Sequence, residues 1–134
     1  MQKRIYLTTS IPYVNASPHI GHALEFVQTD TLARFWRELD FDVFFSSGAD
    51  ENSLKNVQAA EREGISTQKL VDKYSEEFFK LKEAYNLTFD VFNRTSSSKH
   101  FDGAQKLWTS CKAEDINKKT YRGLYCVGCE QFYV

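Results

Sequence analysis

The stretch that decides the fold reads IYLTTSIPYVNASPHIGH over residues 5–22. Its first part, Ile5–Ile11, is short, apolar and rich in β-branched residues, which predicts a β-strand. Pro12 ends this strand, and the residues from there to Pro18 are typical of a turn. Apolar residues then recur at helical spacing, namely Ile20, Leu24, Val27, Leu32, Phe35 and Leu39. The stretch therefore predicts a strand, a turn and a helix that begins just after a proline.

The same alternation continues along the chain. It predicts strands over residues 41–45 and 89–92, a loop over 46–52, helices over 53–63 and from 66 or 67, a helix from 97 or 98, and an extended segment over 121–126. Strands that alternate with helices indicate an α/β fold with a Rossmann-like parallel sheet and helices on both of its faces. Ligands bind such sheets at the carboxyl ends of the strands. We therefore expect the loops over 12–22 and 46–52 to lie side by side and to form the site.

Composition narrows the possible functions. The 134 residues include 17 Lys and Arg and 18 Asp and Glu, so the formal net charge of −1 argues against a general binder of nucleic acid. With 42% hydrophobic residues the chain can form a core. Three cysteines cannot form a complete disulfide framework, and neither a signal peptide nor an apolar run of membrane-spanning length is visible. These features predict a soluble cytoplasmic protein with no membrane contact.

The strongest local signal is a pair of histidines, His19 and His22, around Gly21 at the start of the first predicted helix. The first turn of a helix has free backbone N–H groups and a positive dipole end, which attract phosphate. Gly21 lets a flat ring or a phosphate approach the backbone, and each imidazole can donate a hydrogen bond to a phosphate oxygen. The alternative is an ordinary pair of histidines near a helix start. Neither G-x-G-x-x-G nor a Walker Gly-Lys-Ser/Thr is present, which disfavours nicotinamide dehydrogenases and P-loop enzymes.

Three blocks of sequence, taken in order, carry a family resemblance. The residues His19-Ile20-Gly21-His22 match the signature of class I aminoacyl-tRNA synthetases. The wider segment 9–22, the segment Gly48-Ala49-Asp50-Glu51-Asn52 and the segment 123–133 resemble the methionyl-tRNA synthetases of that class. The resemblance covers nearly the whole chain but only about the N-terminal quarter of such an enzyme. Asn52 and Ser53 depart from the His and Gly that are usual in the family.

The resemblance implies a role for each matching residue. The substrates would be methionine, ATP with Mg²⁺, and tRNA, and the product of the first step would be methionyl-adenylate. Implied contacts are His19 and His22 with the ATP phosphates, as the catalytic groups, Gly21 with adenine, Asn15 near the phosphates, Ile11 and Tyr13 in the methionine pocket, and Asp50 with the α-ammonium group of methionine. Asp50 also suits that role chemically, because a carboxylate at the carboxyl end of a strand can pair with an ammonium group.

Cys126 and Cys129 have the spacing of half a zinc site. The resemblance implies that they are Zn²⁺ ligands whose second cysteine pair lies further along the family's sequence. Cys111 stands alone, and His100 is a possible ligand by residue type only. We expect residues 1–115 to form the N-terminal half of the nucleotide-binding catalytic domain and residues 116–134 to begin the zinc-binding insertion.

The chain lacks the family's second signature, a Lys-Met-Ser-Lys-Ser-type loop that holds the triphosphate. We therefore expect the 134-residue chain by itself not to catalyse methionine-dependent pyrophosphate exchange. Two alternatives remain open from the residues: a nucleotidylyltransferase that uses the same His-x-Gly-His turn, and a non-catalytic binding module that has kept the fold. The sequence does not decide the oligomeric state.

Overall fold

A computed structural model describes residues 3–133 of the chain. The chain divides into two compact units, one up to Ser96 and one from Ser97 onward. The division of the catalytic domain and the zinc-binding insertion at residues 115 and 116 stays a prediction.

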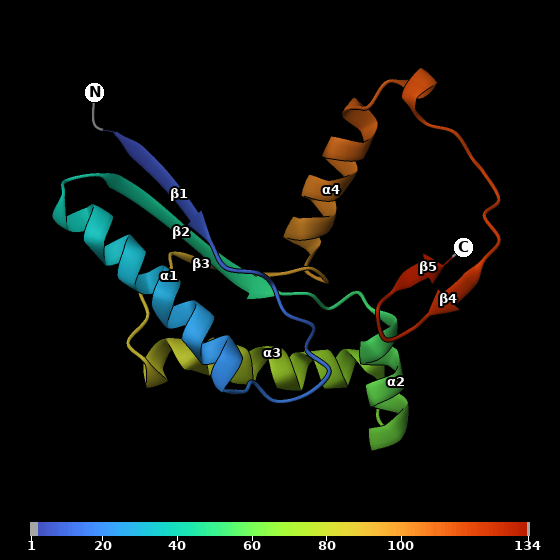
Figure 1. Cartoon of the computed structure of the whole chain (residues 1–134), viewed down its shortest axis with the longest axis horizontal. Coiled ribbons are helices and arrows are strands. Elements are labelled where there is room, and N and C mark those ends of the chain that lie inside the picture. Colours follow the sequence, from blue (N-terminus) through green and yellow to red (C-terminus); the bar gives the residue numbers. More distant parts are fainter. Residues whose placement is uncertain (1–2, 134) are drawn as a thin grey trace. The chain divides into compact units, whose positions relative to one another are not determined.

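The first unit has a parallel sheet in the order β1-β2-β3 (Figure 1). Its strands are β1 (Arg4–Thr8), β2 (Asp42–Ala49) and β3 (Val91–Arg94). Its helices are α1 (Ile20–Glu38), α2 (Leu54–Glu63) and α3 (Thr67–Ala84). The first connection between strands contains α1, and the second contains α2 and α3. The predicted α/β class with a parallel sheet is therefore confirmed.

Strand β2 extends four residues beyond the predicted 41–45, because its polar end is satisfied by distant partners. The hydroxyl of Ser47 lies 2.9 Å from the hydroxyl of Thr9, and the side-chain amide of Asn93 donates to the Ser46 hydroxyl at 3.0 Å. Buried hydroxyls are tolerated in a sheet when they are hydrogen-bonded in this way. The predicted loop over 46–52 is thus strand up to Ala49 and loop only beyond it.

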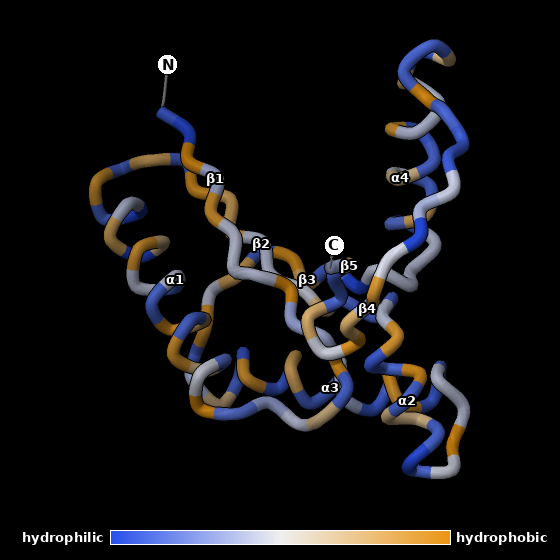
Figure 2. Tube along the Cα trace, turned by 45° about the vertical axis from the view of Figure 1, so that its right-hand side comes forward, coloured by the Kyte–Doolittle hydropathy of each residue, from blue (hydrophilic) through white to orange (hydrophobic). Residues whose placement is uncertain are grey.

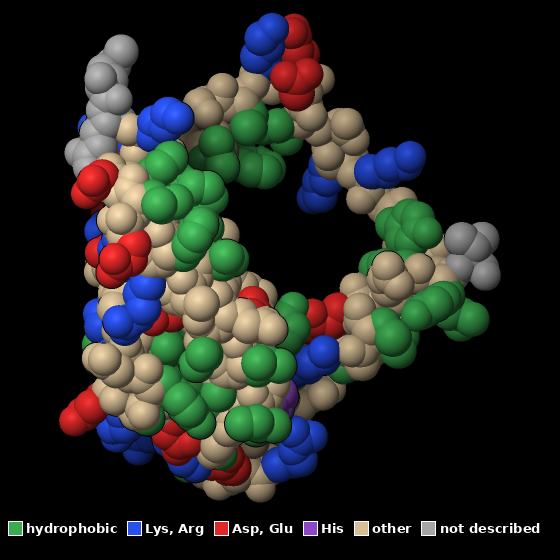
Figure 3. All heavy atoms as spheres, turned by 60° about the vertical axis from the view of Figure 1, so that its left-hand side comes forward, with side chains coloured by type: hydrophobic (Ala, Val, Ile, Leu, Met, Phe, Trp, Pro, Cys, Tyr) green, Lys and Arg blue, Asp and Glu red, His purple; other side chains and the backbone are tan. Residues whose placement is uncertain are grey.

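The core of this unit lies on one face of the sheet. Phe45 of β2 packs in one cluster with Phe26 of α1 and Phe78 of α3. On the other face, the rings of Tyr6 and Phe44 stack with centroids 5.7 Å apart and are 64% and 50% exposed. Hydrophobic side chains are accordingly visible on the surface in Figure 3. Helices α1 and α3 cover the first face. The predicted helices on the other face of the sheet stay a prediction.

In α1, the apolar residues whose spacing predicts the helix are not the residues that face the core. All six residues of that spacing are exposed where the structure describes them, from 37% at Val27 to 80% at Ile20. The core side of α1 carries Ala23, Phe26, Asp30 and Ala33 instead. Figure 2 shows hydrophobic residues recurring along the whole helix, so hydropathy alone does not select the buried side.

Asp30 is buried among these residues because it joins α1 to the segment before β3. Its carboxylate accepts hydrogen bonds from the Thr88 N–H at 2.5 Å and the Thr88 hydroxyl at 2.7 Å, and from Arg34 Nε at 2.6 Å. Burial by itself would raise the pKa of Asp30, but these hydrogen bonds outweigh it and hold the pKa below its ordinary value. Asp30 therefore stabilises the fold above its unfolded-state pKa and loses this contribution as the pH falls through its folded-state pKa.

Two alanine substitutions on α1 are expected to separate the buried side from the exposed one. Phe26→Ala removes a ring that is 1% exposed and should lower the free energy of unfolding by about 3–5 kcal/mol. Leu24→Ala, at a side chain that is 56% exposed, should change it by only about 0.5 kcal/mol. Urea unfolding of the two variants provides the comparison. Equal losses would contradict the placement of α1.

Helix ends follow the local signals in the sequence. The side chains of Ser53, Ser66 and Ser97 each accept a hydrogen bond from a backbone N–H three residues later. Gly64 ends α2 with a φ of 66°, a left-handed conformation that favours glycine. These caps agree with the predicted boundaries.

The second unit contains α4 (Ser98–Ser110), a short 3₁₀ turn over Ala113–Asp115, and a hairpin of β4 (Leu124–Cys126) and β5 (Gln131–Tyr133). The two strands pair antiparallel, with Cys126 opposite Gln131. The ring of Phe132 packs against Tyr121 and Tyr125, each with centroids 4.9 Å away. No helix within residues 3–133 is long and apolar enough to span a membrane.

Candidate functional site

The two predicted loops meet at the carboxyl ends of β1 and β2. The Asp50 N–H donates to the Pro12 carbonyl at 2.9 Å, and Tyr13 and Asp50 form an isolated parallel β-bridge. The expectation that these loops lie side by side is confirmed. The contact places the residue after β2 next to the segment that leads to the histidine pair.

His19 and His22 form a reciprocal cap at the start of α1. The His19 ring accepts a hydrogen bond at Nδ1 from the Gly21 N–H at 3.1 Å, and the His22 ring accepts one at Nδ1 from the His19 N–H at 3.2 Å. This arrangement satisfies two backbone donors that a helix start otherwise leaves open. The same residues that resemble a catalytic signature therefore also build the first turn of the helix.

The cap also fixes where each ring carries its proton. A neutral imidazole has one donor nitrogen and one acceptor nitrogen, and here Nδ1 is the acceptor in both His19 and His22. The proton of each neutral ring therefore lies on Nε2. The two rings stack with centroids 3.8 Å apart and planes inclined by 19°. The cap thus yields two parallel rings that each present an Nε2–H donor.

His22 is held in its neutral form. Burial lowers its pKa from the usual value, the nearby charge of His19 lowers it further, and Glu25 raises it in part. The ring of His22 also meets the edge of Phe78 on α3, with centroids 4.9 Å apart. At neutral pH this ring therefore serves as a hydrogen-bond donor without a full positive charge.

A side chain at Gly21 would crowd the His19 ring of the cap. A Cβ at this position would lie 3.0 Å from Cε1 and 3.1 Å from Nδ1 of His19. These distances are shorter than ordinary contacts, so a side chain would push the His19 ring away from its hydrogen bond with the Gly21 N–H. The structure thus adds a local reason for glycine to the predicted contact with adenine.

A pocket of about 480 Å³ opens in front of the histidine pair. Its walls include four of the predicted site residues, Tyr13, Asn15, His19 and His22, together with Pro12, Ala16, Ser17 and Lys55. Ile11, Gly21 and Asp50 do not line this pocket within the described part of the chain. Ile11 is 41% exposed, and Asp50 pairs with Tyr13 through the β-bridge. The structure therefore brings four of the predicted residues together on one pocket and leaves Ile11, Gly21 and Asp50 outside its lining.

Asp50 is oriented by hydrogen bonds to its Oδ1 atom. The Asn52 N–H donates to it at 3.0 Å, and the Thr95 hydroxyl lies 3.4 Å away. Asn52 also donates from its side chain to the Thr95 carbonyl at 3.3 Å. The residue that departs from the family's usual His therefore ties the Asp50 loop to the end of β3.

Sequence reasoning missed three residues around the site. Lys55 places its ammonium group 5.3 Å from the centre of the Tyr13 ring. Glu25 accepts hydrogen bonds from the N–H of Ser10 at 2.6 Å and from its hydroxyl at 2.8 Å, which ties the end of β1 to α1. Glu51 is fully buried next to Asp50. Only Lys55 had a local signal, because it lies in the first turn of the helix after the second loop.

The cysteine pair lies on the hairpin of the second unit. Cys126 ends β4, and Cys129 lies in the turn that leads to β5. A hydrogen bond with Cys129 raises the pKa of Tyr133, and desolvation adds to this shift. Two thiols on one turn suit half of a tetrahedral zinc site. Within residues 3–133 no cluster of three or more His, Cys, Asp or Glu side chains is placed to hold a metal, so these residues do not form a complete zinc site.

Comparisons with known proteins agree with this geometry. The family described as "tRNA synthetases class I (M)" matches residues 5–134. The methionine–tRNA ligase of Mycobacterium leprae is 45% identical over 130 residues, which are 96% of this chain and 24% of the relative. That of Brucella suis is 40% identical over 133 residues, which are 98% of this chain and 26% of the relative.

A solved structure shows the same fold. Mycobacterium tuberculosis methionyl-tRNA synthetase in complex with methionyl-adenylate superimposes with a TM-score of 0.94 and 42% identity, over 99% of this chain and 26% of that one. The chain therefore spans about a quarter of the length of the relatives that it matches.

Proposed function

Because this chain belongs to the class I tRNA synthetases of the methionyl type, we propose that its first unit forms one side of a site that joins methionine to ATP as methionyl-adenylate. The stacked His19 and His22 rings at the start of α1, next to the loop of Asp50, are the observation that carries this proposal. We assign the complete reaction, including transfer of methionine to tRNA, to a longer enzyme of this family, which we expect to act in the cytoplasm.

In the proposed reaction the methionine carboxylate attacks the α-phosphorus of ATP, and pyrophosphate leaves. Negative charge increases on the phosphate oxygens during this step, and donors that are already oriented stabilise it. His19 and His22 present their Nε2–H groups for this purpose, since their Nδ1 atoms are used by the cap. Asn15 and Lys55 line the same pocket and would add a polar group and a positive charge near the phosphates of ATP. ATP would bind together with Mg²⁺.

We assign the amino acid to Asp50 and to the residues of the first loop beside it. The carboxylate of Asp50 pairs with the α-ammonium group of methionine, and Ile11 and Tyr13 provide the apolar contact for the side chain. Both hydrogen-bond donors near Asp50 approach Oδ1, so Oδ2 is the oxygen that we expect to receive the ammonium. Catalysis then depends mainly on holding the two substrates in line. For the cysteine pair, we propose that Cys126 and Cys129 are zinc ligands that need two further ligands.

Binding by the 134-residue chain tests the proposal. We expect a non-hydrolysable sulfamoyl analogue of methionyl-adenylate to shift the NMR signals of residues 11–22 and 50. Asp50→Asn should weaken its binding by about tenfold or more, because a charge-assisted hydrogen bond is lost. His100→Ala is the control, since this histidine lies on α4 in the second unit and should leave binding unchanged. Shifts confined to residues outside these segments would refute the assignment.

A further inference from the structure

Glu51 is a buried carboxylate whose two oxygens are fully used. Its side chain is 0% exposed. Oε1 accepts hydrogen bonds from Arg94 Nε at 2.6 Å and from the Ser75 hydroxyl at 2.5 Å. Oε2 accepts hydrogen bonds from the Ser96 N–H at 3.2 Å and from the Ser96 hydroxyl. Burial of a charge is tolerated only with partners of this kind, so the position of Glu51 is strongly fixed.

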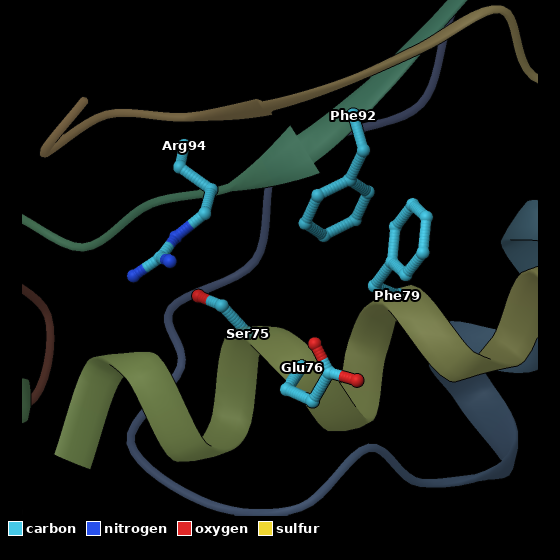
Figure 4. Close-up of a pocket in the computed structure, with 5 residues that line it drawn as sticks. All are labelled: Ser75, Glu76, Phe79, Phe92 and Arg94. Atoms are coloured by element: carbon cyan, nitrogen blue, oxygen red, sulfur yellow. The ribbon is translucent and has the colours of Figure 1, made fainter. Parts of the chain in front are cut away.

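The partners of Glu51 come from two other elements, so the carboxylate joins three parts of the fold. Ser75 lies on α3, while Arg94 ends β3 and also pairs with Asp72 of α3. Figure 4 shows the Arg94 side chain reaching from β3 toward Ser75 on the helix below it. We call Glu51, Ser75, Arg94 and Ser96 the Glu51 clamp. It holds the end of β2 against the end of β3 and against α3.

Thr95 connects this clamp to Asp50. Its hydroxyl accepts a hydrogen bond from the Glu51 N–H at 2.8 Å and lies 3.4 Å from Asp50 Oδ1. Thr95 is itself buried, with 7% exposure, between the two clamp residues Arg94 and Ser96. Any movement of Glu51 therefore moves the hydroxyl that orients the Asp50 carboxylate.

Backbone geometry gives the clamp its direction. Successive side chains of an extended chain point to opposite sides, and Asp50 continues β2 through its bridge with Tyr13. A Glu51 side chain held toward α3 therefore leaves Asp50 on the opposite side of the strand. We propose that Glu51 is a positioning residue, which fixes the carboxylate of Asp50 for the substrate ammonium through Arg94 and Thr95. This proposal rests on the function proposed above for Asp50.

Two substitutions of Thr95 test the connection without removing the buried charge. Thr95→Val keeps the shape of the side chain and loses the hydroxyl, whereas Thr95→Ser keeps the hydroxyl. The amide proton of Asn52, which is bonded to Asp50 Oδ1, reports the position of that carboxylate without any ligand. We expect its hydrogen exchange in the 134-residue chain to become about tenfold faster in Thr95→Val and to stay unchanged in Thr95→Ser.

Ligand binding distinguishes positioning from simple stability. Thr95→Val and Glu51→Gln should each weaken L-methionine binding by about tenfold. The ligand 4-(methylthio)butanoate lacks the amino group and so cannot pair with Asp50. Both variants should therefore bind it with an affinity within about twofold of that of the original chain. Asp72→Asn is the matched control, because it removes the other carboxylate on Arg94 but leaves the Arg94–Glu51 pair and the hydrogen bonds of the Thr95 hydroxyl in place.

The outcomes separate the two proposals. Unchanged exchange at Asn52 in both Thr95→Val and Glu51→Gln would overturn the positioning role, as would equal losses for the two ligands. If exchange becomes faster but Asp50→Asn binds L-methionine as tightly as the original chain, the clamp holds Asp50 but the ammonium assignment is wrong. Faster exchange together with a loss limited to L-methionine supports both.

Discussion

Replacement of either histidine of the pair is expected to reduce adenylate formation by about 10²–10³-fold, the usual effect of removing one oriented donor to a developing negative charge. The substitutions are His19→Asn and His22→Ala, made in a graft in which residues 5–133 of this chain replace the matching quarter of a methionine–tRNA ligase. Methionine-dependent pyrophosphate exchange measures the rate. The loss should fall on kcat, because the phosphate charge that these donors stabilise grows in the transition state.

The choice of asparagine separates the two roles of His19. Asparagine is a good helix N-cap, so His19→Asn should keep the stability of α1 while it loses the Nε2–H donor. His19→Ala should lose the donor and in addition about 1 kcal/mol of stability, because the cap is lost as well. His100→Ala controls for the graft. Full exchange activity in His19→Asn would show that the ring caps the helix and does not assist the reaction.

Replacement of Gly48 with alanine is expected to cost about 3 kcal/mol or more of folding free energy, at the upper end of the effect of overpacking. Gly48 is buried in β2 and pairs with Asn93 of β3. A Cβ there would collide with the Asn93 carbonyl oxygen and would lie 3.1 Å from its carbonyl carbon. Because the obstacle is backbone, β2 and β3 would have to separate, and Asp50 would lose its place beside Tyr13.

Gly103 provides the matched control for this prediction. A Cβ at Gly103 meets no atom within 4 Å, and the residue lies inside α4. Gly103→Ala should therefore stabilise α4 by about 0.5–1 kcal/mol, since alanine favours helix over glycine. Urea unfolding followed by circular dichroism measures both variants. A Gly48→Ala chain as stable as the original would contradict the close pairing of β2 and β3.

The parts of the fold that the sequence predicts well are those set by neighbours in the chain. Ser53, Ser66 and Ser97 cap their helices through backbone groups three residues away, and Gly64 ends α2 through its own φ. Local hydrogen bonds of this kind need no knowledge of the rest of the fold.

The parts that the sequence predicts poorly depend on distant partners. The end of β2 reads as a loop because Ser46 and Ser47 are polar, yet Asn93 and Thr9 satisfy them from other segments. The buried side of α1 follows from the bonds of Asp30 to Thr88, and not from the longest apolar spacing. A one-dimensional pattern does not contain these contacts.

The order of residues is enough to predict the α/β class of the fold, the helix starts and the meeting of the two loops, because Pro12 and Asp50 follow neighbouring strands at the edge where parallel sheets bind ligands. How the side chains are held became visible only in three dimensions. The tertiary structure stacked the two rings and fixed their protons on Nε2. It also buried Glu51 against Arg94, 43 residues away in the chain. The physical reason is that a buried charge must find its partner in space, and the spacing of residues along the chain does not specify that partner.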